Sequence, residues 1–497
     1  MDSLFLKISS HLKELLLTCF LQIKFLLNRN YVFWVGMFIT FSACNKIVEV
    51  DTPLIYTSKG DAFASDANAI SVLNGIYANM SLVALSEGSS INSFMSLYPG
   101  LSADEFTLYS GVTNGSYIAF YQNDLLNTSG PNPWLTSYPI IYKLNDAIDG
   151  INASSGMTKK VKNQLLGEAK FLRAFYYFYL VNLYGPVPLV LNVNYKENSI
   201  LARSSIDIVY QQIVKDLVEA DDLLSENFVG SNGYTASSER VVPNKWAAKA
   251  LLARVYLFTK DYNNAVALST EVINNTSLFS LTDLNSVFLS NSQEAIWQLQ
   301  PVNLGWNTED AKLFIIPETG PSEFNPIFLS DSLLNSFEFN DQRKVNWIDT
   351  TIVDGISYHF PYKYKSATLG ADITEYKMVL RLAEQYLIRA EANVHQNLLS
   401  AAMEDLNTIR NRAGLDKYQG AGNQTSLLLA ILHERRIELF SEWGNRWLDL
   451  KRLGKVDEVM GVYTKIKGGI WNSYDQYYPI FQSELANDPN LVQNEGY

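Results

Sequence analysis

The sequence contains few of the residues that nucleophilic and metal-dependent catalysis uses most. Its 497 residues include only two cysteines and four histidines. His433-Glu434 lacks the second histidine that a zinc-binding H-E-x-x-H helix needs. The chain also has no G-x-S-x-G nucleophile elbow, P-loop or G-x-G-x-x-G fingerprint. These absences leave little basis for nucleophilic, zinc-dependent or nucleotide-dependent catalysis, and no cofactor is predicted.

A basic surface is also missing. The formal net charge is −12, and the first 43 residues hold four basic and two acidic residues, so the chain without them is more acidic still. An acidic chain repels nucleic acid and anionic lipid headgroups. We therefore expect neither a nucleic acid nor an anionic membrane surface as a partner.

The N-terminal residues have the pattern of a secretory signal peptide. Residues 31–41 form an uncharged apolar run, with Lys24 and Arg29 before it. The run is too short to cross a bilayer, which takes roughly 20 apolar residues. Cys44 follows two small residues, in the position that bacterial lipoprotein processing acylates. We predict a signal peptide at 1–43 and a lipid anchor on Cys44.

Cys44 would be the only cysteine left after this cleavage, so no intramolecular disulfide could form and the fold must rest on packing. Two alternatives stay open. Cys44 could instead be a buried free thiol, because Phe41 is bulkier than the leucine that usually stands three residues before a lipidated cysteine. A second apolar stretch at 15–27 indicates either a long leader or a start codon further downstream.

Helical periodicity dominates the rest of the chain. Amphipathic or apolar-striped helices are expected at 67–80, 134–148, 161–184, 206–224 and 427–453. Ala253 and Ala265 are twelve residues apart, as are Ala390 and Ala402, which is the spacing of small contact residues in tetratricopeptide helix pairs. Two such pairs are predicted from these alanines. The helices at 161–184 and 206–224 are candidates for a third.

Two long irregular segments, 94–134 and 278–376, interrupt the helices and are rich in aromatic residues. Tyr358 and three further aromatics alternate with period two, which predicts a short strand. Long loops inside a compact fold are usually functional or disordered, and the aromatic content argues against disorder. We expect an N-terminal region at 44–235 and a C-terminal region at 236–497, packed as one compact unit.

These aromatic insertions are the strongest candidates for a binding site. Flat tyrosine and tryptophan rings cover the apolar C–H faces of sugar rings, and nearby polar groups bond sugar hydroxyls. The candidate ligand-binding residues are Tyr109, Tyr117, Tyr121, Trp306, Asn307 and Trp347. Some of the aromatic residues in the two insertions, above all Trp297, are expected to be core instead.

Paired carboxylates are the remaining candidates for catalysis, as in glycoside hydrolysis. Asp104-Glu105 and Glu309-Asp310 are adjacent in sequence, which does not specify the carboxyl separation that such chemistry needs. We expect Asp104 to cap a turn or helix and Glu309-Asp310 to be solvated. The charged residues of 434–453 are expected to pair with neighbouring helices rather than to form an active site.

Several segments together resemble the SusD/RagB family of bacterial outer-membrane proteins. The resemblance is carried by Ala69-x-x-x-Leu73-Asn74-Gly75-Ile76-Tyr77, Ser102-Ala103-Asp104-Glu105, Glu168-Ala169-Lys170-Phe171-Leu172-Arg173-Ala174, Leu183-Tyr184-Gly185-Pro186-Val187-Pro188, Arg381-Leu382-Ala383-Glu384, Arg389-Ala390-Glu391-Ala392, Glu434-Arg435-Arg436 and Arg446-Trp447-x-Asp449-Leu450. In the C-terminal pattern Phe481 and Glu495 stand where the family has proline.

This resemblance implies an all-α fold, in which four tetratricopeptide-like helix pairs form a scaffold and the irregular segments form the other side. It implies a lipid-anchored nutrient-binding protein at the cell exterior, without catalysis, that works with a SusC-like TonB-dependent transporter. Its ligand residues lie on variable loops, so the aromatic candidates rest on the residue chemistry alone. The alternatives are an α-helical surface glycosidase and a repeat scaffold for envelope assembly that binds only protein.

Overall fold

A computed structural model of the chain describes residues 59–81, 91–128 and 130–497. The predicted signal peptide and Cys44 lie outside these residues. Residues 60–497 form one compact unit, and the expected boundary near residue 235 stays a prediction.

Helices make up most of this unit. Those of its first half are α2 (Lys59–Ala62), α3 (Asp66–Ser81), α4 (Ile91–Ser102), α5 (Gly115–Gln122), α6 (Pro133–Ala153), α7 (Lys159–Tyr184), α8 (Tyr195–Asn198), α9 (Ile206–Leu223), α10 (Lys245–Phe258) and α11 (Tyr262–Asn274). Those of its second half are α12 (Glu309–Phe314), α13 (Asp331–Leu334), α14 (Gln342–Asn346), α15 (Leu382–His395), α16 (Leu399–Arg412), α17 (Gln424–Glu438), α18 (Asn445–Arg452), α19 (Val456–Ile466), the 3₁₀ helix η1 (Ser473–Gln476) and α20 (Gln482–Asn487).

The strands are short and pair only in twos within the described residues. They are β1 (Phe106–Leu108), β2 (Val187–Pro188), β3 (Arg203–Ser204), β4 (Ala295–Leu299), β5 (Ile327–Leu329), β6 (Ile348–Val353), β7 (Ile356–Pro361) and β8 (Lys377–Arg381). All four pairs, β1–β5, β2–β3, β4–β8 and β6–β7, are antiparallel. The strand predicted from the alternating aromatics corresponds to β7, which contains Tyr358 and Phe360, ends before Tyr362 and Tyr364, and forms a hairpin with β6.

The alanines singled out in the sequence lie where helices touch. Ala253 of α10 and Ala265 of α11 are fully buried in one cluster with residues of α15. Ala390 of α15 and Ala402 of α16 are fully buried in a second cluster, with residues of α17. A methyl group at each position lets the helix axes approach closely. Both predicted helix pairs, α10–α11 and α15–α16, are therefore confirmed.

The third expected pair is formed by α7 and α9, which pack along each other. Val209, Ile213 and Leu217 form the buried stripe of α9, as the periodicity predicts. Arg173 of α7 reaches across and donates two hydrogen bonds to Asp216 of α9, at 2.8 and 2.7 Å. Both side chains are buried, so this charged pair fixes the register between the two helices.

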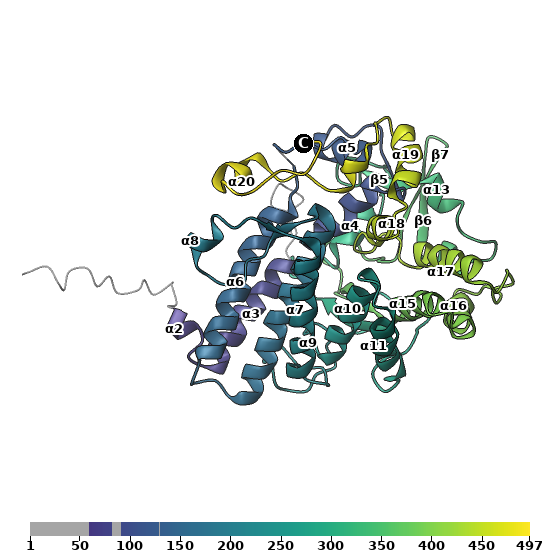
Figure 1. Cartoon of the computed structure of the whole chain (residues 1–497). Coiled ribbons are helices and arrows are strands. Elements are labelled where there is room, and N and C mark those ends of the chain that lie inside the picture. Colours follow the sequence, from purple (N-terminus) through teal and green to yellow (C-terminus); the bar gives the residue numbers. More distant parts are fainter. Residues whose placement is uncertain (1–58, 82–90, 129) are drawn as a thin grey trace, which may run out of the picture. The chain divides into compact units, whose positions relative to one another are not determined.

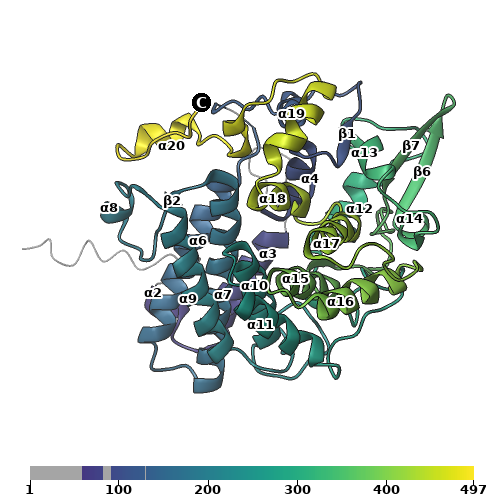
Figure 2. The same cartoon turned by 45° about the vertical axis from the view of Figure 1, so that its right-hand side comes forward.

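The helices form a continuous array in which each contacts the next. Figures 1 and 2 show α6, α7 and α9 side by side, followed by α10, α11, α15 and α16. The β6–β7 hairpin lies at the other end of the unit from α8 in both views. The hairpin of the second insertion therefore lies at one end of the helical array.

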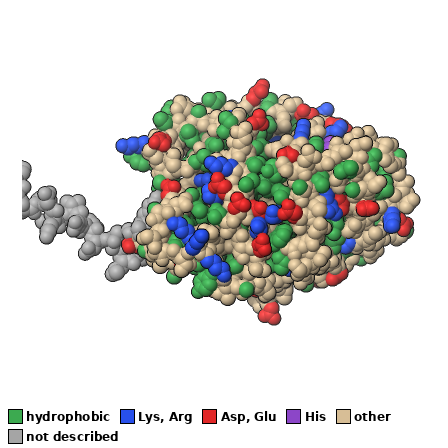
Figure 3. Space-filling model, turned by 60° about the horizontal axis from the view of Figure 1, so that its bottom comes forward, with side chains coloured by type: hydrophobic (Ala, Val, Ile, Leu, Met, Phe, Trp, Pro, Cys, Tyr) green, Lys and Arg blue, Asp and Glu red, His purple; other side chains and the backbone are tan. Residues whose placement is uncertain are grey.

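The surface on the lower side of the Figure 1 view carries charges of both signs. Figure 3 shows acidic and basic side chains interleaved there, with hydrophobic side chains between them. Mixed charges of this kind keep a surface polar without creating a field of one sign.

Candidate functional site

Strand pairing joins the two aromatic insertions, although they are about 220 residues apart in sequence. In the β1–β5 ladder, Phe106 lies opposite Leu329 and Leu108 opposite Ile327. The pairing continues past β1, where Tyr109 N–H donates to the carbonyl of Pro326 at 2.8 Å. The insertions therefore form one surface rather than two separate loops.

Aromatic rings from three strand segments meet on this surface. The rings of Tyr109 and Tyr358 pack edge to face with centroids 6.2 Å apart, and Phe328 packs on Tyr358 at 5.3 Å. All three residues are only partly buried. Edge-to-face contacts between rings hold their orientation and leave faces free. The sequence indicated Tyr109 as a ligand residue but missed Phe328, and it assigned Tyr358 only to a strand.

Trp306 lies in the loop before α12 and is also partly buried. The ammonium group of Lys312, which is exposed on α12, lies 5.0 Å from the centre of its ring. Asn325 fixes the end of α12, because its side-chain amide donates to the carbonyl oxygens of Lys312, Leu313 and Ile315. Asn325 directly precedes Pro326 and β5, so the end of α12 that carries Lys312 is tied to the start of β5.

We call the surface formed by Tyr109, Trp306, Lys312, Phe328 and Tyr358 the insertion face. Phe106 of β1 and Phe314 of α12 pack beneath it with ring centroids 5.6 Å apart. The face thus combines partly exposed rings, a tyrosine hydroxyl from each of two strands and one exposed cation. Such a surface can cover apolar ring faces and bond hydroxyl groups at their edges.

Two predicted residues of the first insertion lie on α5, beneath β1. Tyr117 is buried, and its ring lies 5.9 Å from that of Tyr98. Tyr121 is half-buried, with the ammonium group of Lys467 5.1 Å from its ring centre. Tyr117 therefore has no exposed ring face, and Tyr121 mainly supports β1 from below.

The side chains of Asn307 and Trp347, two of the candidate ligand-binding residues, are buried and hydrogen-bonded within the protein. The side-chain Oδ1 of Asn307 accepts from the backbone N–H groups of Thr374 and Glu375 at 2.8 and 3.0 Å, so the residue organises the loop at 374–375. Trp347 is 0% exposed and donates its indole N–H to the carbonyl of Leu284 at 2.8 Å. Trp297 is core, as predicted, and is also 0% exposed.

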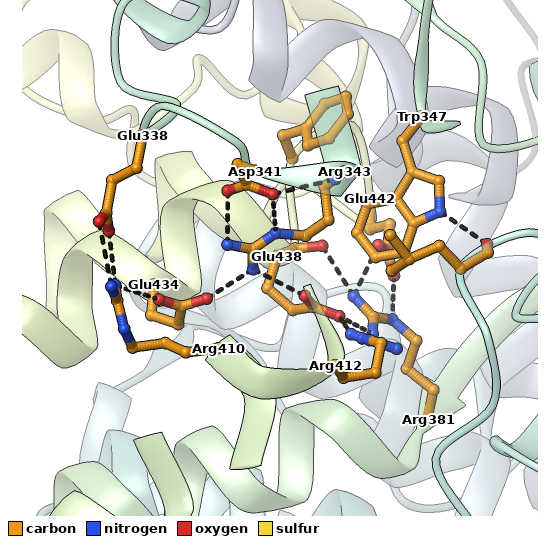
Figure 4. Close-up of polar contacts among 12 residues, drawn as sticks. Glu338, Asp341, Arg343, Trp347, Arg381, Arg410, Arg412, Glu434, Glu438 and Glu442 are labelled. Atoms are coloured by element: carbon orange, nitrogen blue, oxygen red, sulfur yellow. Dashed lines mark hydrogen bonds and ion pairs between the residues drawn. The ribbon is translucent and has the colours of Figure 1, made fainter. Parts of the chain in front are cut away.

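A buried ionic network attaches the second insertion to the helical scaffold (Figure 4). Arg343 of α14 contacts Asp341 and two glutamates of α17, Glu434 at 2.6 Å and Glu438 at 3.0 Å. Arg381 of β8 adds bonds to Glu438, at 2.6 Å, and to the residues that follow α17. The charged residues of α17 thus pair with neighbouring elements, which confirms the structural interpretation of 434–453.

The pKa shifts of Glu438 and Arg381 show that opposite charges in the network stabilise each other's charged forms. Burial alone raises the pKa of Glu438, but Arg412, Arg381 and Arg343 outweigh it and hold that pKa well below its ordinary value. Arg381 has a pKa well above its usual range, because the attraction of Glu442, Glu438 and Glu294 exceeds the cost of burial. Glu438 and Arg381 are therefore held in their charged forms by each other and by their neighbours, as in a structural clamp.

The first insertion is attached in the same way. Asp104, just before β1, accepts hydrogen bonds from Arg446 at 2.7 and 3.0 Å and from Arg436 at 2.8 Å. Although burial raises the pKa of Asp104, these two arginines lower it to about 2. Asp104 is therefore a counter-ion for α17 and α18 and not the cap that the sequence suggested.

The other nominal carboxylates are also occupied. Asp310 is buried and forms an ion pair with Lys377, and Glu309 accepts from the side-chain amide of Asn303 at 2.7 Å. The expectation that Glu309-Asp310 is solvated was wrong, because α12 is folded inward onto α4 and β8. Glu105 is buried, and burial together with the charge of Asp104 raises its pKa to about 7.

The described part of the chain has no group of three or more His, Cys, Asp or Glu side chains placed to hold a metal ion. No helix in the described ranges combines the length and apolarity needed to cross a bilayer.

Comparison with known proteins identifies the fold. Residues 354–497 match the model of the SusD family, and residues 58–257 match a related model described as "Starch-binding associating with outer membrane". A solved SusD superfamily protein from Bacteroides vulgatus superposes with a TM-score of 0.75 at 21% identity, covering 88% of this chain and all of that one. The chain belongs to the SusD/RagB family, and its helix-dominated fold is that of the SusD superfamily.

One curated relative matches along nearly the whole chain, and another matches a shorter part of it. The SusD-like protein P2 of Formosa agariphila is 25% identical over 535 aligned residues, covering 95% of this chain and 100% of its own. The starch-binding protein SusD of Bacteroides thetaiotaomicron is 36% identical over 124 residues, which is 24% of this chain and 21% of that protein. A solved structure named "Laminarin binding SusD-like protein" superposes with a TM-score of 0.71 at 24% identity and covers 87% of this chain and 99% of its own.

Proposed function

We propose that this chain is a cell-surface lipoprotein that captures an oligosaccharide at the insertion face. In this proposal Cys44 carries the lipid anchor in the outer membrane, and the bound glycan passes to a SusC-like TonB-dependent transporter. The observation that carries the proposal is the insertion face itself, where the rings of Tyr109, Phe328 and Tyr358 meet. The second insertion, which supplies Phe328 and Tyr358, is attached to the scaffold by the buried ionic network (Figure 4).

The properties of the relatives support a binding role. Those with a named activity are called starch-binding or laminarin-binding, and none of the relatives cited above is named as an enzyme. The description of the matching family model also refers to association with the outer membrane. These names belong to the relatives, and they make neutral glucans the first ligands to test on this chain.

The carboxylate chemistry favours capture over glycoside cleavage. Glycosidases place two carboxyl groups on either side of the scissile bond, one of them able to give up a proton. Asp104 is instead held between two arginines, and Glu105 behind it is 2% exposed. Neither group is open to a polysaccharide.

Isothermal titration of the mature chain with maltohexaose, laminarihexaose, xylohexaose and mannohexaose tests the proposal. We expect at least one to bind, and Trp306→Ala to weaken that binding about tenfold, because an aromatic contact contributes about 0.5–1.5 kcal/mol beyond its buried area. Trp246→Ala is the matched control, since Trp246 is another partly buried tryptophan, on the scaffold helix α10. Equal glycan affinities for the two variants would show that the binding site does not include Trp306 and lies elsewhere than the insertion face.

A further inference from the structure

A second group of aromatic residues lies at the other end of the unit, where α6, α8 and the C-terminal segment meet. It lines a cavity of about 320 Å³, a size within the range of small-molecule binding sites. Trp134, Tyr138 and Tyr142 are each four residues apart on α6, so they form one ladder along a single helix face. Tyr195 of α8 completes the aromatic lining.

The ladder changes from buried to exposed along its length. Trp134 is 2% exposed, Tyr138 is partly buried and Tyr142 is 47% exposed, while Tyr195 is 71% exposed. Exposed apolar groups that cluster, unlike single ones, mark interaction sites. The inner rings form a floor, and Tyr142 and Tyr195 present their rings to solvent at the mouth of the cavity.

The floor is held in place before any ligand arrives. Trp134 donates its indole N–H to Glu484 of α20 at 3.3 Å, and its ring lies 5.0 Å from that of Tyr138. The Tyr138 hydroxyl donates to the carbonyl of Pro188 at 2.8 Å. The segment after α8 and the C-terminal segment are also joined, since the side-chain amide of Asn490 donates to the carbonyl of Ile200 at 2.7 Å. A fixed floor reduces the ordering cost of binding.

The polar groups of the lining define the class of ligand. Glu484 and Asp488 are the charged residues among the lining residues, which include no lysine or arginine. Two carboxylates repel an anionic ligand and accept hydrogen bonds from hydroxyl groups. Rings that cover apolar C–H faces, beside acceptors for hydroxyl protons, suit a neutral sugar.

We propose that this cavity, which we call the α6–α8 groove, is a second carbohydrate-binding site for neutral oligosaccharides, separate from the insertion face. The inference rests on the proposed function in assuming that the protein handles glycans. Figures 1 and 2 place α8 and α20 at the opposite end of the unit from β6 and β7. Two sites so placed can hold a long glycan at two points, and the second contact then forms at a high effective concentration.

The experiment separates the two sites by variants. A face variant, Tyr109→Ala/Trp306→Ala, removes the insertion face, and a groove variant adds Tyr142→Ala/Tyr195→Ala to it. Tyr234→Ala added to the face variant is the matched control, because Tyr234 is 47% exposed, as is Tyr142, and lies outside the groove lining. Thermal unfolding of each variant verifies that the fold is retained.

Titrations use maltohexaose, laminarihexaose, xylohexaose and mannohexaose, with hexagalacturonate as an anionic probe. We expect the face variant to keep binding at least one neutral hexasaccharide, the groove variant to lose about tenfold or more in affinity, and the Tyr234 control to bind like the face variant. Hexagalacturonate should bind more weakly than the neutral sugars.

The outcomes distinguish this inference from the proposed function. If the face variant binds glycan more weakly than the unmodified chain does, that difference tests only whether the insertion face binds glycan. The groove proposal is overturned if the face variant binds none of the four neutral sugars, if the groove variant binds like its control, or if hexagalacturonate binds more tightly than all of them.

Discussion

Replacing Arg381 by methionine is the sharpest test of the buried ionic clamp. The guanidinium group is 1% exposed and makes bonds to Glu442 at 2.8 and 2.9 Å, to Glu294 at 2.9 Å and to Glu438 at 2.6 Å. Methionine keeps much of the side-chain length but removes the cation. Three buried carboxylates then share the remaining cations, chiefly Arg412 and Lys363.

The expected cost follows from this geometry. Removing one partner of a buried ion pair typically destabilises a protein by about 3–5 kcal/mol, because the other charge stays buried without compensation. Arg381 serves three carboxylates, so we expect a loss in the free energy of unfolding at the upper end of that range. The second insertion should loosen first, since Arg381 ends β8 and bonds to residues at the end of α17.

Urea unfolding measures this loss, and hydrogen exchange locates it. The matched control is Lys455→Met, which breaks an exposed pair with Glu458 in which the two side chains are 55% and 70% exposed. Exposed pairs contribute about 0–1 kcal/mol, so the control should barely move the midpoint. Equal shifts for the two variants, or unchanged exchange in β6–β7 after Arg381→Met, would refute the clamp.

Two other predictions concern stability. Glu105 has a folded-state pKa of about 7, above its unfolded value, so the folded protein holds this proton more tightly and loses stability as pH rises toward and through 7. Glu105→Gln should remove that loss, so at pH 8 we expect its free energy of unfolding to exceed that of the unmodified chain by about 3 kcal/mol. Urea unfolding of both proteins at pH 5 and pH 8 measures the difference. The same change in unfolding free energy between the two pH values in both proteins would contradict the prediction. Ala402→Leu should cost about 1–3 kcal/mol by overpacking the α15–α16 contact, whereas Ala401→Leu on the exposed side of α16 should cost little in thermal unfolding. Equal melting temperatures for the two leucine variants would argue against close helix contact.

The scaffold was predictable because its determinants are local. The twelve-residue spacing of Ala253 and Ala265 places two small residues at one helix contact, and both are 0% exposed. The alternation around Tyr358 likewise predicted a strand, because side-chain direction along a strand has a period of two. Such patterns involve residues that are close in sequence, so a single sequence is enough to interpret them.

The site was only partly predictable because its determinants are distant in sequence. Trp347 has polar neighbours in the sequence, yet it is buried with Phe440 and Lys363 against its ring. Asp104 finds its partners more than 300 residues away, in Arg436 and Arg446. Neither contact leaves a periodic pattern. Composition could indicate that aromatic insertions matter, but only the β1–β5 pairing shows which rings meet.

Glycan capture at the insertion face is the central claim, and a structure of the chain crystallised with a bound neutral hexasaccharide tests it most directly. The hexasaccharide is the one that binds most tightly in the titrations. We expect a sugar ring against Trp306, with hydroxyl groups within hydrogen-bond distance of Tyr109 or Tyr358. A sugar bound only on the helical array, with Trp306 and Tyr109 free of it, would contradict the claim.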